Sequence, residues 1–163
     1  VEGFCYGQPM WDELFKLGKD LDVRAGCPNL IERIESGLLS YGNDINSTHN
    51  LYEAGLGKFL TTGISKECLA YDKLTSISNP KKMIKPIEIK GSPIQPITYN
   101  SKVTNNSGDV IGQISSAAWS PDFKVNVAIG MIDRKYWQKS ENLFVEIMEN
   151  DKREIIIKDK FWS

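Results

Sequence analysis

The sequence contains little cysteine and histidine, with three Cys and a single His among 163 residues. Cys5, Cys27 and Cys68 lie far apart, and His49 has no second histidine to pair with, so the spacing of a structural zinc site is absent. An odd number of separated cysteines is typical of reduced thiols, which predicts a cytoplasmic protein. We therefore expect neither a metal site nor a disulfide framework.

An excess of charge of one sign is also absent, because 20 Lys and Arg oppose 21 Asp and Glu and the formal net charge is −1. This balance excludes whole-chain electrostatic attraction to nucleic acid or to an anionic membrane surface. No apolar run approaches the roughly 20 residues that cross a bilayer, and no secretory signal is visible. With 40% hydrophobic and 25% charged residues, the composition predicts a globular protein that binds neither nucleic acid nor membrane.

The first half of the chain has the periodicity of helices. Over Met10–Leu17 the apolar residues form one helical stripe, and Gly18 would end that helix. Asn29 and Glu32 match a capping box at the start of a second helix, which Gly37 ends after about two turns. The pattern predicts two short amphipathic helices.

A third short helix is predicted from about Ser65 to Lys73, with Cys68 and Leu69 turned inward. Residues 74–82 are polar and contain proline, which is typical of a linker. We therefore predict a domain boundary near residue 80.

After this boundary the apolar period becomes that of strands. Lys102–Thr104 and Val110–Ile114 flank a polar turn and indicate a hairpin. Apolar residues alternate strictly over Val125–Met131, as in a half-buried strand. Two more strands are expected over Asn142–Met148 and Glu154–Lys158. Five or six short strands at this spacing predict a small barrel or sandwich.

The segment from Arg33 to Asp44 is dense in groups that suit a polar ligand. The Glu35 carboxylate can accept two parallel hydrogen bonds from an amino-heterocycle edge, and Tyr41 offers a flat apolar face with a polar tip. The alternative is that Arg33 and Glu35 are surface charges and that Tyr41 merely follows the helix. Composition and spacing leave both interpretations open.

Four blocks of sequence, in order, resemble the aminomethyltransferase family, which comprises the glycine-cleavage T-protein and its tetrahydrofolate-dependent demethylase relatives. The blocks are Gly7–Leu14, Arg24–Asp44, Glu53–Gly57 and the strand pair within Gly112–Met131. The second block carries the family's arginine, aliphatic, glutamate, small, glycine pattern, followed by Tyr-Gly and an acid. The residues around Cys27 are similar to those of the dimethylsulfoniopropionate demethylase branch.

The resemblance implies an α+β fold in two parts. Residues 1–80 would be the C-terminal part of a folate-binding aminomethyltransferase domain, and residues 81–163 would be the family's small antiparallel β-barrel domain. The chain would then be a fragment, and the missing N-terminal half of the same protein would be its partner and supply the catalytic aspartate. We accordingly predict no catalytic residue within the chain and no activity for the chain alone. An exposed sheet edge at the N-terminal end predicts self-association through residues 1–8.

The resemblance also implies tetrahydrofolate as the cofactor. Glu35 would hold the pterin ring through its amino and N3 hydrogens, a role that suits a carboxylate facing two parallel donors. Tyr41, Glu53 and Trp119 are further candidates for cofactor binding, although each is also compatible with a purely structural role.

The function that the resemblance implies is transfer of a one-carbon unit from an amine or sulfonium donor to tetrahydrofolate. Two alternatives stay open: a folate-binding module without catalysis, and the C-terminal domain of a dimethylglycine or sarcosine oxidising enzyme. In the family that this chain resembles, an arginine or a longer acidic loop follows a few residues after the turn that corresponds to Glu53–Gly57, and the arginine would contact the folate glutamate tail. Here residues 58–66 offer only Lys58 and Lys66, which are poorer partners for a carboxylate.

Overall fold

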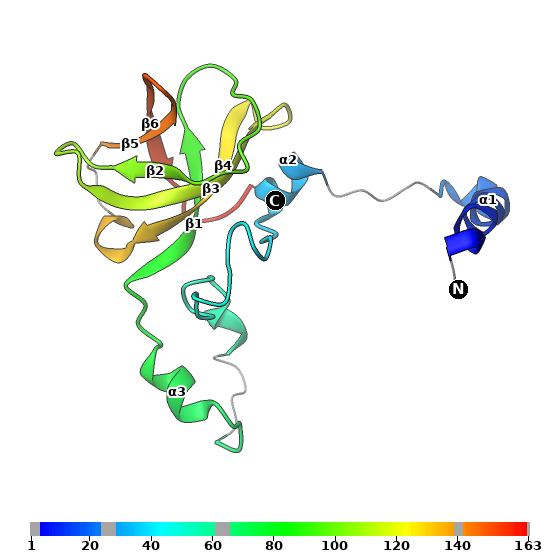
Figure 1. The fold of residues 1–163 in the computed structure, drawn as a ribbon, viewed down its shortest axis with the longest axis horizontal. Helices are drawn as coiled ribbons and strands as arrows, with labels where there is room; N and C mark the ends of the chain where they lie inside the picture. The colour runs from blue at the N-terminus through cyan, green and yellow to red at the C-terminus, as the bar shows by residue number, and fades with distance from the viewer. Residues whose placement is uncertain (1–3, 24–28, 61–65, 139–141, 163) are drawn as a thin grey trace.

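The computed structural model describes residues 4–23, 29–60, 66–138 and 142–162. Its centre is a closed barrel of antiparallel strands (Figure 1). The strands are β1 (Lys82–Ile89), β2 (Ser101–Thr104), β3 (Val110–Ser120), β4 (Val125–Asp133), β5 (Leu143–Met148) and β6 (Asp151–Ile157). Their order around the barrel is β1-β4-β3-β2-β5-β6, and β6 pairs with β1 to close it. The predicted small antiparallel barrel is confirmed.

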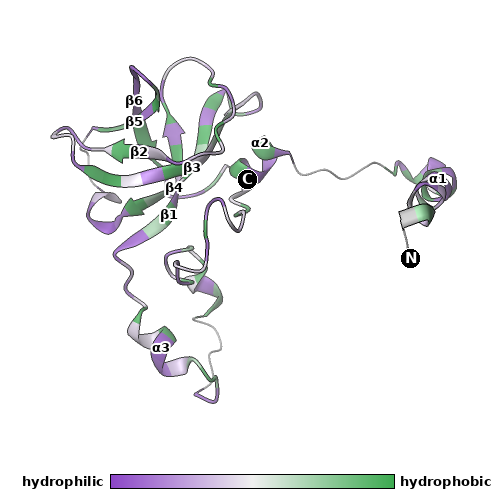
Figure 2. Ribbon diagram, viewed as in Figure 1, coloured by the Kyte–Doolittle hydropathy of each residue, from purple (hydrophilic) through white to green (hydrophobic). Residues whose placement is uncertain are grey.

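Aliphatic side chains from all six strands fill the barrel interior as one cluster. Ile87 and Ile89 contribute from β1, and Ala128 and Ile132 contribute from the neighbouring β4. Because successive side chains of a strand point to opposite faces, the residues between them face outward. Hydrophobic residues therefore recur along the strands (Figure 2).

The outer face of β1, β3 and β4 is covered as well. Every other residue of β4 from Val127 to Met131 packs with Ile34 of α2 (Leu30–Ser36), and Phe161 and Trp162 pack against the same cluster. The predicted alternation is confirmed, but β4 is buried on both faces rather than one. The barrel thus provides an apolar platform on which α2 is docked.

The described chain begins with the 3-10 turn Phe4–Tyr6 and α1 (Gly7–Leu17), which Gly18 ends as predicted. α1 lies apart from the barrel (Figure 1), and none of its residues is buried. Residues 4–8 are therefore helical rather than a sheet edge, residues 1–3 lie outside the described residues, and self-association through residues 1–8 stays a prediction. No helix of the described residues is long and apolar enough to cross a membrane.

The helix predicted from about Ser65 to Lys73 was placed too early in the chain, and its first residue, Ser65, lies outside the described residues. α3 spans Tyr71–Ser76, so it extends into the predicted linker. Tyr71 and Leu74 are half-buried three positions apart, whereas Cys68 and Leu69, which were expected to face inward, are exposed. The less exposed apolar positions of this helix lie further along the chain than the predicted ones. The predicted boundary near residue 80 falls between α3 and β1.

The last hairpin is tighter than predicted. β6 begins at Asp151 rather than Glu154, and it pairs with β5 through a turn at Glu149 and Asn150. Asn150 has a φ of 68°, a left-handed conformation that asparagine tolerates better than most residues.

Candidate functional site

Both ends of α2 are fixed by specific contacts. The Asn29 side chain caps the helix by accepting a hydrogen bond from the Glu32 N–H at 2.9 Å, as the capping-box pattern predicts. Gly37 ends the helix with a φ of 71°, and a Cβ at this position would lie 2.5 Å from the Phe161 ring. Glycine satisfies both the backbone conformation and this close approach. The length of α2 is therefore set at both ends.

Glu35 lies in the last turn of α2 and is buried, with 7% of its surface exposed. The preceding residue, Ile34, is inserted into the apolar cluster on the outer face of the barrel. The backbone N–H of Trp162 donates to the Glu35 backbone oxygen at 2.8 Å. The interpretation of Glu35 as a solvated surface charge is therefore wrong. A carboxylate held at low exposure on a fixed helix is suited to accept paired hydrogen-bond donors.

Arg33 is not a surface charge either. Its guanidinium Nη1 lies 2.5 Å from Oδ2 of Asp44, and the side chains of Arg33 and Asp44 are 14% and 0% exposed. The same Oδ2 accepts the Ser40 N–H at 2.7 Å, and Nη1 also donates to the Leu38 carbonyl at 3.0 Å. These contacts fold the segment after α2 back onto the helix.

Strand β3 reaches the same carboxylate through a β-bulge. The pairing of β3 with β4 shifts register between Ile114 and Ser116, which leaves Ser115 as an extra residue. The hydroxyls of two consecutive residues therefore face Asp44. Ser115 donates to Oδ1 at 2.5 Å and Ser116 donates to it at 2.8 Å.

We call Arg33, Asn43, Asp44, Ser115 and Ser116 the Asp44 cluster. The Ser116 hydroxyl also accepts hydrogen bonds from Arg33 Nη2 at 2.6 Å and from Asn43 Nδ2 at 2.7 Å. The buried charge of Asp44 is thus offset by a guanidinium and three further donors. The two serines were not predicted as site residues, because a serine within a strand has no sequence pattern that marks it as a ligand. The one available signal was the run of small residues over Ser115–Ala118.

The other predicted site residues lie in different surroundings. Tyr41 is 73% exposed, in the turn that follows α2. Glu53 is engaged locally, since Oε2 accepts the Asn50 N–H at 3.0 Å and its carbonyl accepts the Ile84 N–H at 2.8 Å. Trp119 is half-buried on β3. The backbone hydrogen bond from Ile84 attaches the turn of Glu53 to β1, whereas Tyr41 belongs to the segment that the Asp44 cluster holds.

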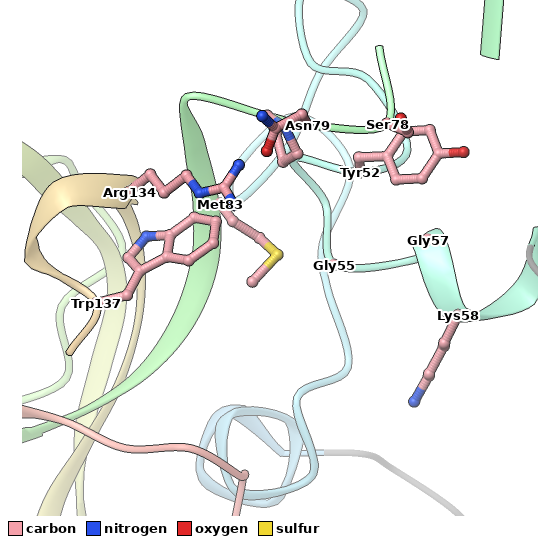
Figure 3. Close-up of a pocket in the computed structure, with 10 residues that line it drawn as sticks. Tyr52, Gly55, Gly57, Lys58, Ser78, Asn79, Met83, Arg134 and Trp137 are labelled. Atoms are coloured by element: carbon pink, nitrogen blue, oxygen red, sulfur yellow. The ribbon is translucent and has the colours of Figure 1, made fainter. Parts of the chain in front are cut away.

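A pocket of about 280 Å³ opens between residues 52–58 and the barrel (Figure 3). Arg134 and Trp137 line it from the barrel side, and Lys58 lines it from the other. The indole N–H of Trp137 donates to the Ile132 carbonyl at 2.8 Å, and the Arg134 guanidinium lies 5.8 Å from the indole ring centroid. The Arg134 guanidinium beside this fixed aromatic ring suits an anionic ligand, whereas the Lys58 side chain points away from the ring (Figure 3).

Lys85 of β1 contacts the same indole, with Nζ 4.6 Å from the ring centroid. Burial lowers the pKa of Lys85, and the nearby Asp159 carboxylate opposes this shift. Within the described part of the chain, no group of His, Cys, Asp and Glu side chains could hold a metal ion. The candidate site residues described above are carboxylates, cationic side chains and aromatic rings.

Residues 84–161 match the family of the glycine cleavage T-protein C-terminal barrel domain. The barrel part of the chain is thus a domain of this family, and the chain as a whole is similar to the C-terminal part of aminomethyltransferases. Dimethylsulfoniopropionate demethylase DmdA of Ruegeria pomeroyi is 42% identical over 165 residues, which cover 99% of this chain and 44% of the demethylase. An aminomethyltransferase of Flavobacterium psychrophilum is 27% identical over 168 residues, which cover 96% and 43%.

The crystal structure of glycine cleavage system aminomethyltransferase T from Bartonella henselae shares the fold, with a TM-score of 0.69 at 22% identity. The match covers 80% of this chain and 37% of that structure. The chain therefore spans less than half the length of the relatives it matches. The resemblance drawn from the four sequence blocks is confirmed.

Proposed function

We propose that this chain carries the pterin-binding carboxylate of a tetrahydrofolate-dependent one-carbon transferase, and that the transferred unit is a methyl group from a sulfonium donor. The observation that supports the folate site is the buried Glu35 carboxylate on a helix fixed at both ends. The donor follows from similarity: the named demethylase is 42% identical, against 27% for the aminomethyltransferase.

Glu35 would act by binding and orienting the pterin. The 2-amino group and N3–H of a pterin are adjacent, parallel donors, and an ionised carboxylate accepts both in a paired geometry. Low exposure strengthens these hydrogen bonds, because less water competes for the carboxylate. This pairing fixes the ring and with it the nitrogen that receives the one-carbon unit. Tyr41 and Trp119 are candidates for contacts with the ring faces.

The chain would contribute binding rather than the chemical step. Glu35 touches the edge of the pterin and not the reacting nitrogen, so we assign no catalytic residue to these 163 residues. The catalytic carboxylate would come from the part of the family protein that this chain does not span. We therefore expect the isolated chain to bind tetrahydrofolate without transferring a methyl group.

The pocket beside residues 52–58 is the candidate site for the carboxylates of the folate tail. Lys58 follows the glycine-rich turn, and Arg134 of the barrel lines the same pocket. A guanidinium from the barrel would supply the bidentate partner that residues 58–66 lack. We expect Arg134→Gln to weaken binding of tetrahydrofolate more than binding of tetrahydropterin, which has no glutamate tail.

Calorimetric titration with tetrahydrofolate tests the proposal. Glu35→Ala should weaken binding by about tenfold or more, because it removes two hydrogen bonds to a charged group. Glu32→Ala is the matched control, since Glu32 is an exposed carboxylate of the same helix and should leave the affinity unchanged. Equal heats for the wild type and Glu35→Ala would contradict the proposed site, as would a wild-type chain that binds no tetrahydrofolate.

A further inference from the structure

We infer that the Asp44 cluster is the device by which the barrel orients Glu35, so that Ser115 and Ser116 of β3 are positioning residues of the pterin site. This inference rests on the proposed function, because it assumes that Glu35 holds the pterin. The barrel would then contribute to cofactor binding through Ser115 and Ser116, which lie far from α2 in sequence.

The need for such a device follows from how α2 is held. The helix has seven residues and docks on the barrel through Ile34 and its apolar neighbours. One backbone hydrogen bond, from the Trp162 N–H to the Glu35 carbonyl, also holds its last turn, but it comes from the C-terminal segment and not from a strand of the barrel. Apolar contacts are not directional, so they fix the position of a short helix better than its rotation. A side-chain hydrogen bond is directional, and it can therefore set the rotation.

Arg33 provides that directional contact. Successive residues of an α-helix are rotated by about 100°, so fixing the direction of Arg33 also fixes the direction of Glu35 two positions later. Arg33 donates through Nη1 to Asp44 and through Nη2 to Ser116, at 2.5 and 2.6 Å. The guanidinium is planar, and two donors held on different partners leave it little freedom.

The barrel fixes the other end of this contact. Asp44 Oδ1 accepts from Ser115 and Ser116, which lie at the bulge in the pairing of β3 with β4. The bulge presents both hydroxyls to one oxygen, which a regular strand could not do because its side chains alternate between faces. A chain of contacts thus runs from the β3 backbone through Asp44 and Arg33 to the turn of α2 that carries Glu35.

The test replaces the barrel hydroxyls and leaves α2 unchanged. In the double variant Ser115→Ala/Ser116→Ala, Asp44 Oδ1 loses both of its hydroxyl donors, and tetrahydrofolate affinity should fall by about tenfold. Ser101→Ala is the matched control, because Ser101 is also a buried strand serine, but its hydroxyl has no hydrogen-bond partner among the described residues. It should leave the affinity unchanged.

Two further measurements separate positioning from a general loss of stability. In a double-mutant cycle, the serine replacements should have almost no effect on affinity once Glu35→Ala is present, because they act through Glu35. Amide hydrogen exchange of α2, measured without ligand, should become about tenfold faster in the serine variant and stay unchanged in Ser101→Ala.

Full additivity in the cycle, or unchanged α2 exchange in the serine variant, would overturn the inference. A wild-type chain that fails to bind tetrahydrofolate would instead refute the proposed function, and the exchange measurement would then still decide whether the barrel hydroxyls fix α2.

Discussion

Ile34→Ala tests whether α2 is a separately docked element on the barrel surface. The Ile34 side chain is fully buried against Val127 and Ile129 of β4. Replacing a buried isoleucine by alanine costs about 2–5 kcal/mol. A seven-residue helix has little stability of its own, so α2 depends on this packing. The loss should therefore appear as release of α2 while the barrel stays folded.

Native-state amide hydrogen exchange measures this directly. In Ile34→Ala the amides of α2 should exchange roughly 30-fold faster or more, which corresponds to the lower end of that cost, and the barrel amides should change little. Ile87→Ala is the matched control, because Ile87 is equally buried but lies inside the barrel. It should accelerate exchange across the strands. The reasoning is refuted if Ile34→Ala accelerates barrel exchange as much as α2 exchange, or leaves α2 unchanged.

Three further predictions concern stability. Gly37→Ala should lower the free energy of unfolding by more than about 1 kcal/mol. The control Gly42→Ala should lower it clearly less, because both glycines have positive φ but a Cβ at Gly42 would meet no atom within 4 Å. Urea unfolding measures the stability of both variants, and equal losses would contradict the expected clash between a Cβ at position 37 and the Phe161 ring. Ser101→Ala should leave stability unchanged or raise it by up to about 1 kcal/mol, because its buried hydroxyl is unsatisfied among the described residues; a clear loss of stability would be inconsistent with that. The hydrogen bond from Lys90 lowers the pKa of Glu88 below its ordinary 4.5, so its stabilisation is present above about pH 4.5 and is lost as the pH falls through the lower, folded pKa. Glu88→Gln should reduce this loss of stability at acid pH by less than about 1 kcal/mol, since the Lys90 side chain is 46% exposed. An unchanged pH profile would argue against this contribution of Glu88.

Local patterns were sufficient to predict much of the fold. The alternation over Val125–Met131 predicted β4, and the spacing of Asn29, Glu32 and Gly37 predicted both ends of α2. These signals are readable because the physical cause lies within a few residues. α3 was misplaced because its stripe has only two half-buried residues in the helix, too few to outweigh a competing apolar pair at Cys68 and Leu69.

The surroundings of the candidate site could not be predicted in the same way. Sequence analysis singled out Glu35 but gave no indication that Arg33 would meet Asp44, or that both would reach serines more than 70 residues away in the chain. The contact depends on a register shift in β3, and a bulge of this kind leaves no signature in composition or periodicity. Long-range polar contacts become visible only once the barrel has brought the strands together.

The most direct test of the account is carboxyl 13C NMR of the chain labelled at glutamate, recorded during titration with tetrahydrofolate. The Glu35 signal is assigned by its absence from the spectrum of Glu35→Gln. We expect this signal to shift on binding, while that of the exposed Glu32 on the same helix stays in place. A ligand that binds and leaves the Glu35 carboxyl signal unmoved would contradict the central claim that this carboxylate holds the pterin.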